Sequence, residues 1–337
     1  MSNIKAWAAH GPKEKLVPFE FDPGPLKDGE IEVAVDYCGL CHSDLSVLNN
    51  DWGISQYPFV PGHEVIGRIV ALGREAKGLR IGQLVGVGWY SGSCHHCKQC
   101  VAGEEHLCAE ASSTIIGHAG GFAERVRTEW SWAIPLPDSL DPASAGPLMC
   151  AGVTVFSPLQ LNDIKPGSHV GVVGIGGLGH LGVKFAKAWG CEVTAFTSSV
   201  SKYEEAKKLG ADHVVSSTDS AAIGALAGTF DLLLITVNVT LDWASLINAL
   251  APKGTLHLVG AVDQPIPVQA FQLIMGQRSI AGSPTGSPAT MAQMLAFAAL
   301  HSIAPQVEHF PMSMVNDALA HLESGKARYR VVLDADF

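Results

Sequence analysis

The chain has 337 residues, of which 47% are hydrophobic and 16% are charged, and its formal net charge is −10. This composition supplies ample material for a buried core, gives little sign of disorder and, with the length, favours two domains. The acidic balance opposes a nucleic-acid surface, which needs a basic stripe. Because residues 1–11 lack the apolar run of a signal peptide and no stretch reaches about 18 consecutive apolar residues, we expect a cytoplasmic protein without a membrane partner.

The first chemically active side chains in chain order are widely separated. Cys41, the neighbours His63 and Glu64, and finally Cys150 lie in three different segments. A catalytic zinc needs about three protein ligands and one open position, and two sulfurs with one nitrogen make such a set. Each residue taken alone is more often a packing residue than a ligand. These residues can therefore form a zinc site only if the fold brings them together.

Between these segments lies a loop with four cysteines, in the pattern C-x2-C-x2-C-x7-C: Cys94, Cys97, Cys100 and Cys108. Four thiolates on one short loop can close a tetrahedron around zinc, and a closed shell predicts a structural rather than a catalytic metal. The bacterial iron–sulfur run has a final gap of about three residues followed by proline, whereas Ala109 follows here. A cluster of free thiols or disulfides is the remaining alternative.

A glycine-rich turn follows an apolar run at residues 169–175. Gly174, Gly176 and Gly179 form G-x-G-x-x-G between a predicted strand and a predicted helix at 181–190, the context in which this motif binds pyrophosphate. Strands predicted at 192–197, 213–216, 230–237 and 255–261 alternate with helices at 202–209 and 241–250. This alternation predicts an α/β fold with a doubly wound parallel sheet of the Rossmann type.

The end of the second strand of that sheet bears on the nucleotide. An NAD site usually places a carboxylate there, but this chain has Thr197, Ser198 and Ser199, with Lys202 close behind. Hydroxyl donors and a cation suit a 2′-phosphate, so we favour NADP over NAD. The alternative interpretation is that this run is only a polar turn and helix cap.

Several motifs in this order resemble the zinc-dependent medium-chain alcohol dehydrogenases. They are the four-cysteine loop and residues 37–45, 61–67, 150–158, 174–180 and 326–333. Within that family the chain is most similar to the cinnamyl-alcohol-dehydrogenase branch and its bacterial NADPH-dependent broad-range aldehyde reductases, particularly over residues 41–66. The resemblance covers about Ile4 to the C-terminus. It implies a β-rich GroES-like catalytic domain with a structural zinc lobe at residues 1–149, to which 287–337 return, and a Rossmann NADP-binding domain at 150–286.

The resemblance also implies residue roles. Cys41, His63 and Cys150 fall on catalytic zinc ligands, and Glu64 falls on an acidic neighbour that can become a ligand. Ser43 falls on the hydroxyl that exchanges a proton with the substrate, and Asp44 on a carboxylate that orients His63. The implied cofactor contacts are Ser43, Thr154, Gly174, Ile175, Gly176, Gly177, Leu178, Gly179, His180, Thr197, Ser198, Ser199, Lys202, Thr236, Gly260, Ser283, Pro284 and Thr285. Cys38 and Cys191 fall on no ligand position. Ser46 replaces a histidine that many relatives carry, so the proton relay is expected to end differently.

The implied activity is the reversible reduction of aldehydes to primary alcohols by hydride transfer from NADPH, with two zinc ions per chain. The alternative within the class is an NAD-dependent or cinnamyl-type alcohol dehydrogenase that acts mainly in oxidation. A catalytically inactive binding protein would be favoured by a missing ligand, yet the implied ligands are all present. Trp52, Trp89 and Tyr90 are candidates for the wall of the substrate channel, with ordinary packing as the alternative. An edge strand predicted at 278–283 supports the hypothesis of a homodimer.

Overall fold

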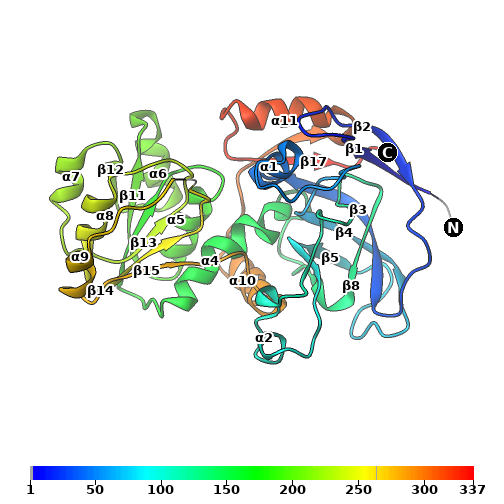
Figure 1. Ribbon diagram of the computed structural model, residues 1–337, viewed down its shortest axis with the longest axis horizontal. Coiled ribbons are helices and arrows are strands. Elements are labelled where there is room, and N and C mark those ends of the chain that lie inside the picture. Colours follow the sequence, from blue (N-terminus) through cyan, green and yellow to red (C-terminus); the bar gives the residue numbers. More distant parts are fainter. Residues whose placement is uncertain (1–2, 263) are drawn as a thin grey trace. The chain divides into compact units, whose positions relative to one another are not determined.

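The computed structural model describes residues 3–262 and 264–337, and its contacts divide the chain into two compact units. The first unit comprises Met1–Cys150 and Thr285–Phe337, and the second comprises Ala151–Pro284 (Figure 1). The chain therefore leaves the first unit directly after Cys150 and returns to it at Thr285.

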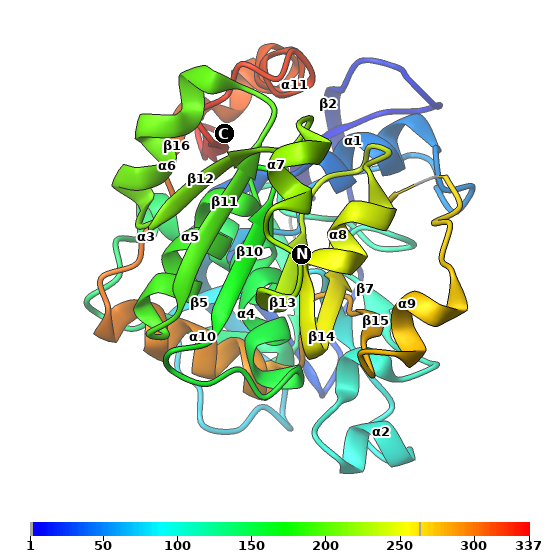
Figure 2. The ribbon, with the colours of Figure 1, turned by 90° about the vertical axis from the view of Figure 1, so that its left-hand side faces the viewer.

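The second unit is built on a six-stranded sheet in which all paired strands are parallel. Its strands are mostly continuous apolar runs, because a parallel sheet covered by helices is buried on both faces. Figure 2 shows the strands side by side. In spatial order they are β12 (His213–Ser216), β11 (Glu192–Thr197), β10 (His169–Val173), β13 (Phe230–Ile235), β14 (Leu250–Leu258) and β15 (Ser279–Gly282).

The helices of the second unit fall into two packed groups. One group contains α4 (Ala151–Leu161), α5 (Gly179–Ala188) and α6 (Tyr203–Leu209), and the other contains α7 (Ser220–Gly224), α8 (Trp243–Ala249) and α9 (Ala270–Ile274). Two helices begin at aspartate caps, since Asp219 accepts from the backbone of α7 and Asp242 from that of α8. The strand order reverses between β10 and β13, which is where nucleotides bind in such sheets.

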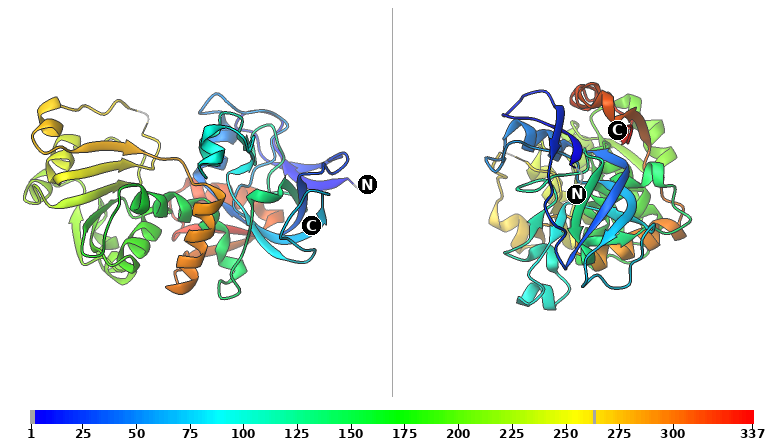
Figure 3. Two further views of the ribbon diagram at one scale, coloured as in Figure 1. Left: turned by 90° about the horizontal axis from the view of Figure 1, so that it is seen from below. Right: turned by 90° about the vertical axis from the view of Figure 1, so that its right-hand side faces the viewer.

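The first unit is organised around the long strand β3 (Glu30–Leu40). The C-terminal strand β17 (Arg330–Asp334) pairs antiparallel with β3, so residues from the two ends of the chain complete one sheet (Figure 3). The sheet order is β16 (Val307–Pro311), β17, β3, β4 (Val65–Leu72), β5 (Leu84–Val87) and β9 (Ala133–Pro135), and β8 (Arg125–Glu129) also pairs with β3.

Smaller elements complete the first unit around a core of buried aliphatic and aromatic side chains. Two strand pairs are β1 (Ile4–Ala8) with β2 (Val17–Phe21), and β6 (Tyr90–Gly92) with β7 (Ser112–Ser113). The helices are α1 (His42–Asn49), α2 (Lys98–Val101), α3 (Pro142–Ala145), α10 (Pro288–Leu300) and α11 (Val315–Glu323). None of the helices described here combines the length and the hydrophobicity that crossing a lipid bilayer requires.

The predicted fold class is confirmed, and in the second unit the differences lie at element ends and in two short helices. The helix predicted at 181–190 begins at Gly179, because the last glycine of the motif is already helical. The strand predicted at 255–261 spans Leu250–Leu258, and its pairing with β13 shifts register between Phe230 and Leu232. The short helices α7 and α9 carry too few residues for a periodic apolar pattern, and the sequence did not predict them.

Candidate functional site

The dispersed candidate ligands converge in the first unit. One ligand atom from each of Cys41, His63, Glu64 and Cys150 lies within 4.8 Å of the others, and all four residues are buried. Cys41 directly follows β3, and His63 and Glu64 directly precede β4. Because β3 and β4 are antiparallel neighbours, with Cys38 opposite Val65, the end of one and the start of the other meet. Cys150 reaches the same point at the end of a short 3-10 turn, Gly146–Met149.

His63 is oriented by a buried carboxylate. Asp44 Oδ1 lies 2.9 Å from His63 Nδ1 and accepts from the Gly62 backbone N–H at 2.9 Å, while Oδ2 accepts from Cys41 N–H at 3.0 Å. The other ring nitrogen, Nε2, is buried and has no hydrogen-bond partner among the described residues. A histidine whose Nδ1–H is held by a carboxylate presents the lone pair of Nε2, which is the usual state of a metal-ligating imidazole.

The thiols of this cluster favour a bound cation. The hydrogen bond from Cys150 and the positive charge of Arg330 hold the pKa of the Cys41 thiol well below its usual range, although burial opposes them. The pKa of Cys150 is raised in turn by the same hydrogen bond and by burial. The donor set consists of two buried sulfurs and the buried Nε2 of His63, which has no hydrogen-bond partner among the described residues. Such a set fits zinc.

Glu64 is held in a buried ion pair that the sequence alone did not indicate. Arg330 of β17 donates from Nη2 to Glu64 Oε1 at 2.5 Å and to the Leu40 carbonyl at 3.2 Å, and the two side chains are 5% and 0% exposed. Burial raises the pKa of the Glu64 carboxyl to about 7, although the charge of Arg330 opposes the rise. A Cβ atom on Gly39 would lie 2.1 Å from Glu64 Oε2, so only glycine leaves room for this carboxylate.

Two of the three candidate channel aromatics lie beside the cluster. The Trp89 ring meets the edge of His63 at a centroid distance of 4.9 Å, and Trp52 meets Trp89 at 6.2 Å. Trp52 is 39% exposed, so this aromatic pair extends from the buried histidine toward solvent. Tyr90 instead packs against Trp132 at 5.3 Å.

Ser43 and Ser46 both lie on α1, which begins directly after Cys41. Both serines are half-buried and three residues apart, so they occupy the same face of the helix. This arrangement is compatible with a hydroxyl relay, and the roles of the two serines stay predictions.

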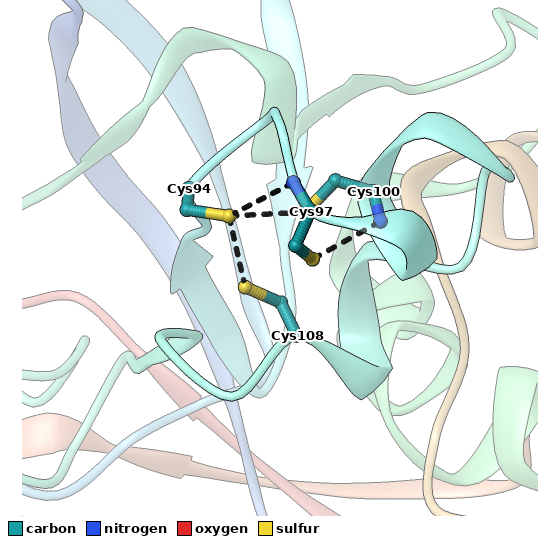
Figure 4. Close-up of side chains that lie close together, drawn as sticks. All are labelled: Cys94, Cys97, Cys100 and Cys108. Carbon is teal, nitrogen blue, oxygen red and sulfur yellow. Dashed lines mark hydrogen bonds between the residues drawn. The ribbon is translucent and has the colours of Figure 1, made fainter.

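The four-cysteine loop forms a second cluster. The sulfurs of Cys94, Cys97, Cys100 and Cys108 point toward one another and lie within 4.8 Å of one another (Figure 4). Cys94 Sγ is 3.5 Å from Cys108 Sγ and 3.9 Å from Cys100 Sγ. Zn–S bonds of about 2.3 Å place tetrahedral sulfurs about 3.8 Å apart. The backbone N–H groups of Cys97, Cys100 and Glu110 point at sulfurs, which stabilises thiolates. All eight cysteines are free, so the donor set fits a closed zinc shell rather than disulfides.

The glycine motif lies at a pocket of about 490 Å³ in the second unit. Gly174 has φ +95°, and a Cβ on Gly179 would lie 1.8 Å from the Gly174 carbonyl, so both positions require glycine. A Cβ on Gly176 would enter open space within the pocket wall, which is the space that a pyrophosphate needs. Seven predicted cofactor residues line this pocket: Gly174, Ile175, Gly176, Thr197, Ser198, Ser199 and Lys202.

Lys202 reaches back over the glycine loop. Its Nζ donates to the Ile175 carbonyl at 2.7 Å, which places a cation beside Ser198 and Ser199 in the pocket wall. Among the described residues of the wall, the one acidic residue is Asp242, whose carboxylate accepts from Ser220 Oγ at 2.6 Å and from Ser245 Oγ at 2.7 Å. These hydrogen bonds lower the pKa of Asp242, and its carboxylate is bound to serines of α7 and α8. The pocket wall therefore fits a nucleotide that carries an additional phosphate.

Other predicted cofactor residues support the loop from behind. Thr236 Oγ1 donates to the carbonyls of Val173 at 2.9 Å and Gly174 at 3.0 Å, and buried His180 is hydrogen bonded to the Gly176 carbonyl at 3.1 Å. The backbone of Gly260 approaches Val237 closely. Thr154, Gly177, Leu178, Gly179, Ser283, Pro284 and Thr285 lie outside the pocket lining, and their contacts stay predictions. Four further residues of the pocket lining follow β12 or precede α8 and were not predicted from the sequence: Ser217, Thr218, Ser220 and Asp242. Their position after strand ends could have indicated that they line the nucleotide pocket.

Comparisons with known proteins agree with this geometry. The alcohol dehydrogenase GroES-like domain family matches residues 27–138, and the zinc-binding dehydrogenase family matches residues 177–299. The chain is 55% identical over 330 residues to aldehyde reductase AdhA of Synechocystis, covering 98% of each protein. A cinnamyl alcohol dehydrogenase from Sorghum bicolor has a similar structure, with a TM-score of 0.94, 38% identity and coverage of 99% and 98%. The Helicobacter pylori enzyme CAD, solved with NADP(H), has a TM-score of 0.90 at 29% identity and 98% coverage of both chains.

Proposed function

Because this chain belongs to the zinc-dependent medium-chain alcohol dehydrogenases, we propose that it reduces aldehydes to primary alcohols, reversibly, with NADPH as the hydride donor. The observation that carries the proposal is the buried set of Cys41, His63 and Cys150, in which His63 Nε2 has no hydrogen-bond partner among the residues that the structure describes. The relative at 55% identity, named an aldehyde reductase, supports the choice of substrate class.

Each metal-site residue receives a defined task. Cys41, His63 and Cys150 would hold a catalytic zinc, and Cys94, Cys97, Cys100 and Cys108 would hold a structural one. Asp44 keeps the His63 ring in the orientation that presents Nε2. Arg330 keeps Glu64 beside the ligands, where its second oxygen, Oε2, has no partner among the described residues.

When bound, zinc supplies Lewis-acid polarisation of the carbonyl, and NADPH supplies the hydride. Ser43 Oγ holds the proton that the product oxygen receives, and Ser46 on the same face of α1 offers the next hydroxyl. Trp52 and Trp89 cover the approach to His63 with apolar surface, which excludes water from the reacting carbonyl. In the alcohol-oxidising direction, Ser43 Oγ takes up the proton.

The two units divide this work. We assign the catalytic role to the first unit, which contains both cysteine clusters, and NADP binding to the second unit, which contains the glycine motif. Gly174, Gly176 and the start of α5 would receive the pyrophosphate, while Ser198, Ser199 and Lys202 would receive the 2′-phosphate.

Initial rates with butanal and cinnamaldehyde, each measured with NADPH and NADH, test this proposal. We expect kcat/KM to be at least about tenfold higher with NADPH, since a charge-assisted contact to the 2′-phosphate exists only for that cofactor. Lys202→Ala should lower the NADPH value by about tenfold and leave the NADH value unchanged. Lys208→Ala, an exposed lysine outside the pocket, is the matched control. Equal rates with NADH in the wild-type protein would overturn the cofactor assignment.

The second candidate is a cinnamyl-type or NAD-dependent alcohol dehydrogenase that acts mainly in oxidation. The aromatic pair Trp52 and Trp89 favours it, because two rings in edge-to-face contact offer an aromatic substrate further ring surface to pack against. A cinnamaldehyde kcat/KM far above that of butanal would support a cinnamyl-type pocket. A higher kcat/KM for the oxidation of cinnamyl alcohol with NAD than for the reduction of cinnamaldehyde with NADPH would support an enzyme that acts mainly in oxidation.

We also infer that the protein forms a homodimer through β15. Among the described residues this strand pairs with β14 alone, and Phe271 and Ile274 of α9, with the following Met275, are 65–78% exposed. An unprotected edge beside exposed apolar side chains is stabilised by pairing with a second copy. Light scattering should give twice the chain mass of 35.4 kDa. Phe271→Glu with Met275→Glu should shift the protein to monomers, and a monomeric wild-type protein at micromolar concentration would refute the inference.

A further inference from the structure

A buried histidine in the second unit has no task in the chemistry described so far. His257 of β14 is 2% exposed, and both of its ring nitrogens are hydrogen bonded. Nδ1 lies 3.0 Å from Asn162 Nδ2, and Nε2 lies 2.9 Å from Ser283 Oγ. Asn162 directly follows α4, and Ser283 directly follows β15. One imidazole therefore joins three segments of the sheet unit.

The direction of each hydrogen bond follows from the donors available. Asn162 Nδ2 also donates to the Pro158 carbonyl at 2.7 Å, and a carbonyl can only accept, so the amide NH2 must face both partners. His257 Nδ1 is then an acceptor. Burial lowers the pKa of His257 to about 4, so the ring is neutral near pH 7. A neutral ring with an accepting Nδ1 carries its proton on Nε2 and donates it to Ser283 Oγ.

This assignment determines what the Ser283 hydroxyl can do. Its oxygen accepts from His257, so its own hydrogen is available for donation. Among the described residues, Ser283 Oγ makes no hydrogen bond other than the one with His257. Ser283 is also one residue past the carboxyl end of β15, at the same edge of the parallel sheet where the strand ends of β10, β11 and β13 line the nucleotide pocket. Ligands of such sheets bind along this edge.

We propose that His257, held by Asn162, is a positioning residue that fixes the Ser283 hydroxyl as a hydrogen-bond donor to the nicotinamide half of the bound dinucleotide. The proposal rests on the proposed cofactor. The strand order places Ser283 two strands beyond β13, on the far side of the point where the order reverses, whereas Ser198 and Lys202 lie on the near side. A dinucleotide that spans this point leaves its nicotinamide half, whose base carries a carboxamide acceptor, on the side of Ser283.

The test compares NADPH with 2′-phospho-ADP-ribose, which lacks only the nicotinamide base and therefore its carboxamide acceptor. Calorimetry would measure the Kd of NADPH and of 2′-phospho-ADP-ribose for the wild-type protein and for His257→Leu, Ser283→Ala and the double variant. We expect each single change to weaken NADPH binding by about tenfold, the loss of one hydrogen bond, and the double variant to lose no more. Binding of 2′-phospho-ADP-ribose should stay unchanged. His257→Gln should retain most of the affinity, because its amide NH2 can replace the Nε2–H donor.

Other outcomes are decisive as well. If His257→Leu weakened the binding of both ligands equally, the histidine would only stabilise the sheet. If Ser283→Ala left NADPH binding unchanged, the Ser283 hydroxyl would not be a donor to the cofactor. Either result overturns the proposal. A wild-type protein that prefers NADH would refute the proposed cofactor separately. In that case the same variants are compared on NADH and ADP-ribose, and the same two criteria apply.

Discussion

Cys150→Ala is expected to lower kcat/KM for aldehyde reduction by about a thousandfold or more and to remove one of two zinc ions per chain. The loss of a thiolate leaves His63 and Cys41 as an incomplete buried donor set, and a mutation at a metal ligand removes the charge that stabilises the developing alkoxide. Metal analysis by mass spectrometry and initial rates with butanal and NADPH would measure the two effects on the same sample.

Two further cysteine variants serve as controls. Cys38→Ala removes a fully buried thiol that lies outside the cluster, so it should keep both zinc ions and most of the activity. Cys97→Ser should instead lose the other zinc ion and lower the melting temperature, because structural zinc sites contribute directly to folding. If Cys150→Ala retained two zinc ions, or if Cys38→Ala lost one, the assignment of ligands would be wrong.

The sequence predicted the family and the fold class correctly because their signals are local. The spacing of Cys94 to Cys108 and the glycines from Gly174 to Gly179 are read within one loop each, and continuous apolar runs indicate buried parallel strands. The meeting of Cys41, His63 and Cys150 required the order of motifs shared with a family, since no local pattern states that residues more than 100 positions apart are neighbours.

The residues that sequence reasoning missed depend on distant partners. Arg330 directly precedes the apolar run Val331–Leu333 of β17, and its partner Glu64 lies 266 positions away. His257 likewise stands between two leucines of β14, and its partners Asn162 and Ser283 come from two other segments. A polar residue inside an apolar strand is a signal that a partner must exist, because an unpartnered buried polar group is costly. The sequence does not say which residue that partner is.

Arg330→Met is expected to lower the free energy of unfolding by about 3–5 kcal/mol, because it leaves the Glu64 carboxylate buried without its counter-charge. Adding Glu64→Gln should recover much of that loss, since the pair is then replaced by neutral groups. Urea denaturation of the zinc-loaded variants would measure both effects. The matched control is Arg68→Met, which breaks an exposed pair with Asp36 and should cost no more than about 1 kcal/mol.

The zinc content of Arg330→Met separates two roles of the ion pair. Arg330 is not a metal ligand, so a variant that is destabilised but still holds two zinc ions would show that the pair supports the fold of the first unit. If Arg330 also restrains the Glu64 carboxylate beside the metal ligands, the variant should release zinc to a chelator at a different rate from Arg68→Met at equal stability, because the carboxylate is then free to move relative to Cys41 and Cys150. A loss below about 1 kcal/mol together with an unchanged rate would mean that the buried pair contributes no more than an exposed one.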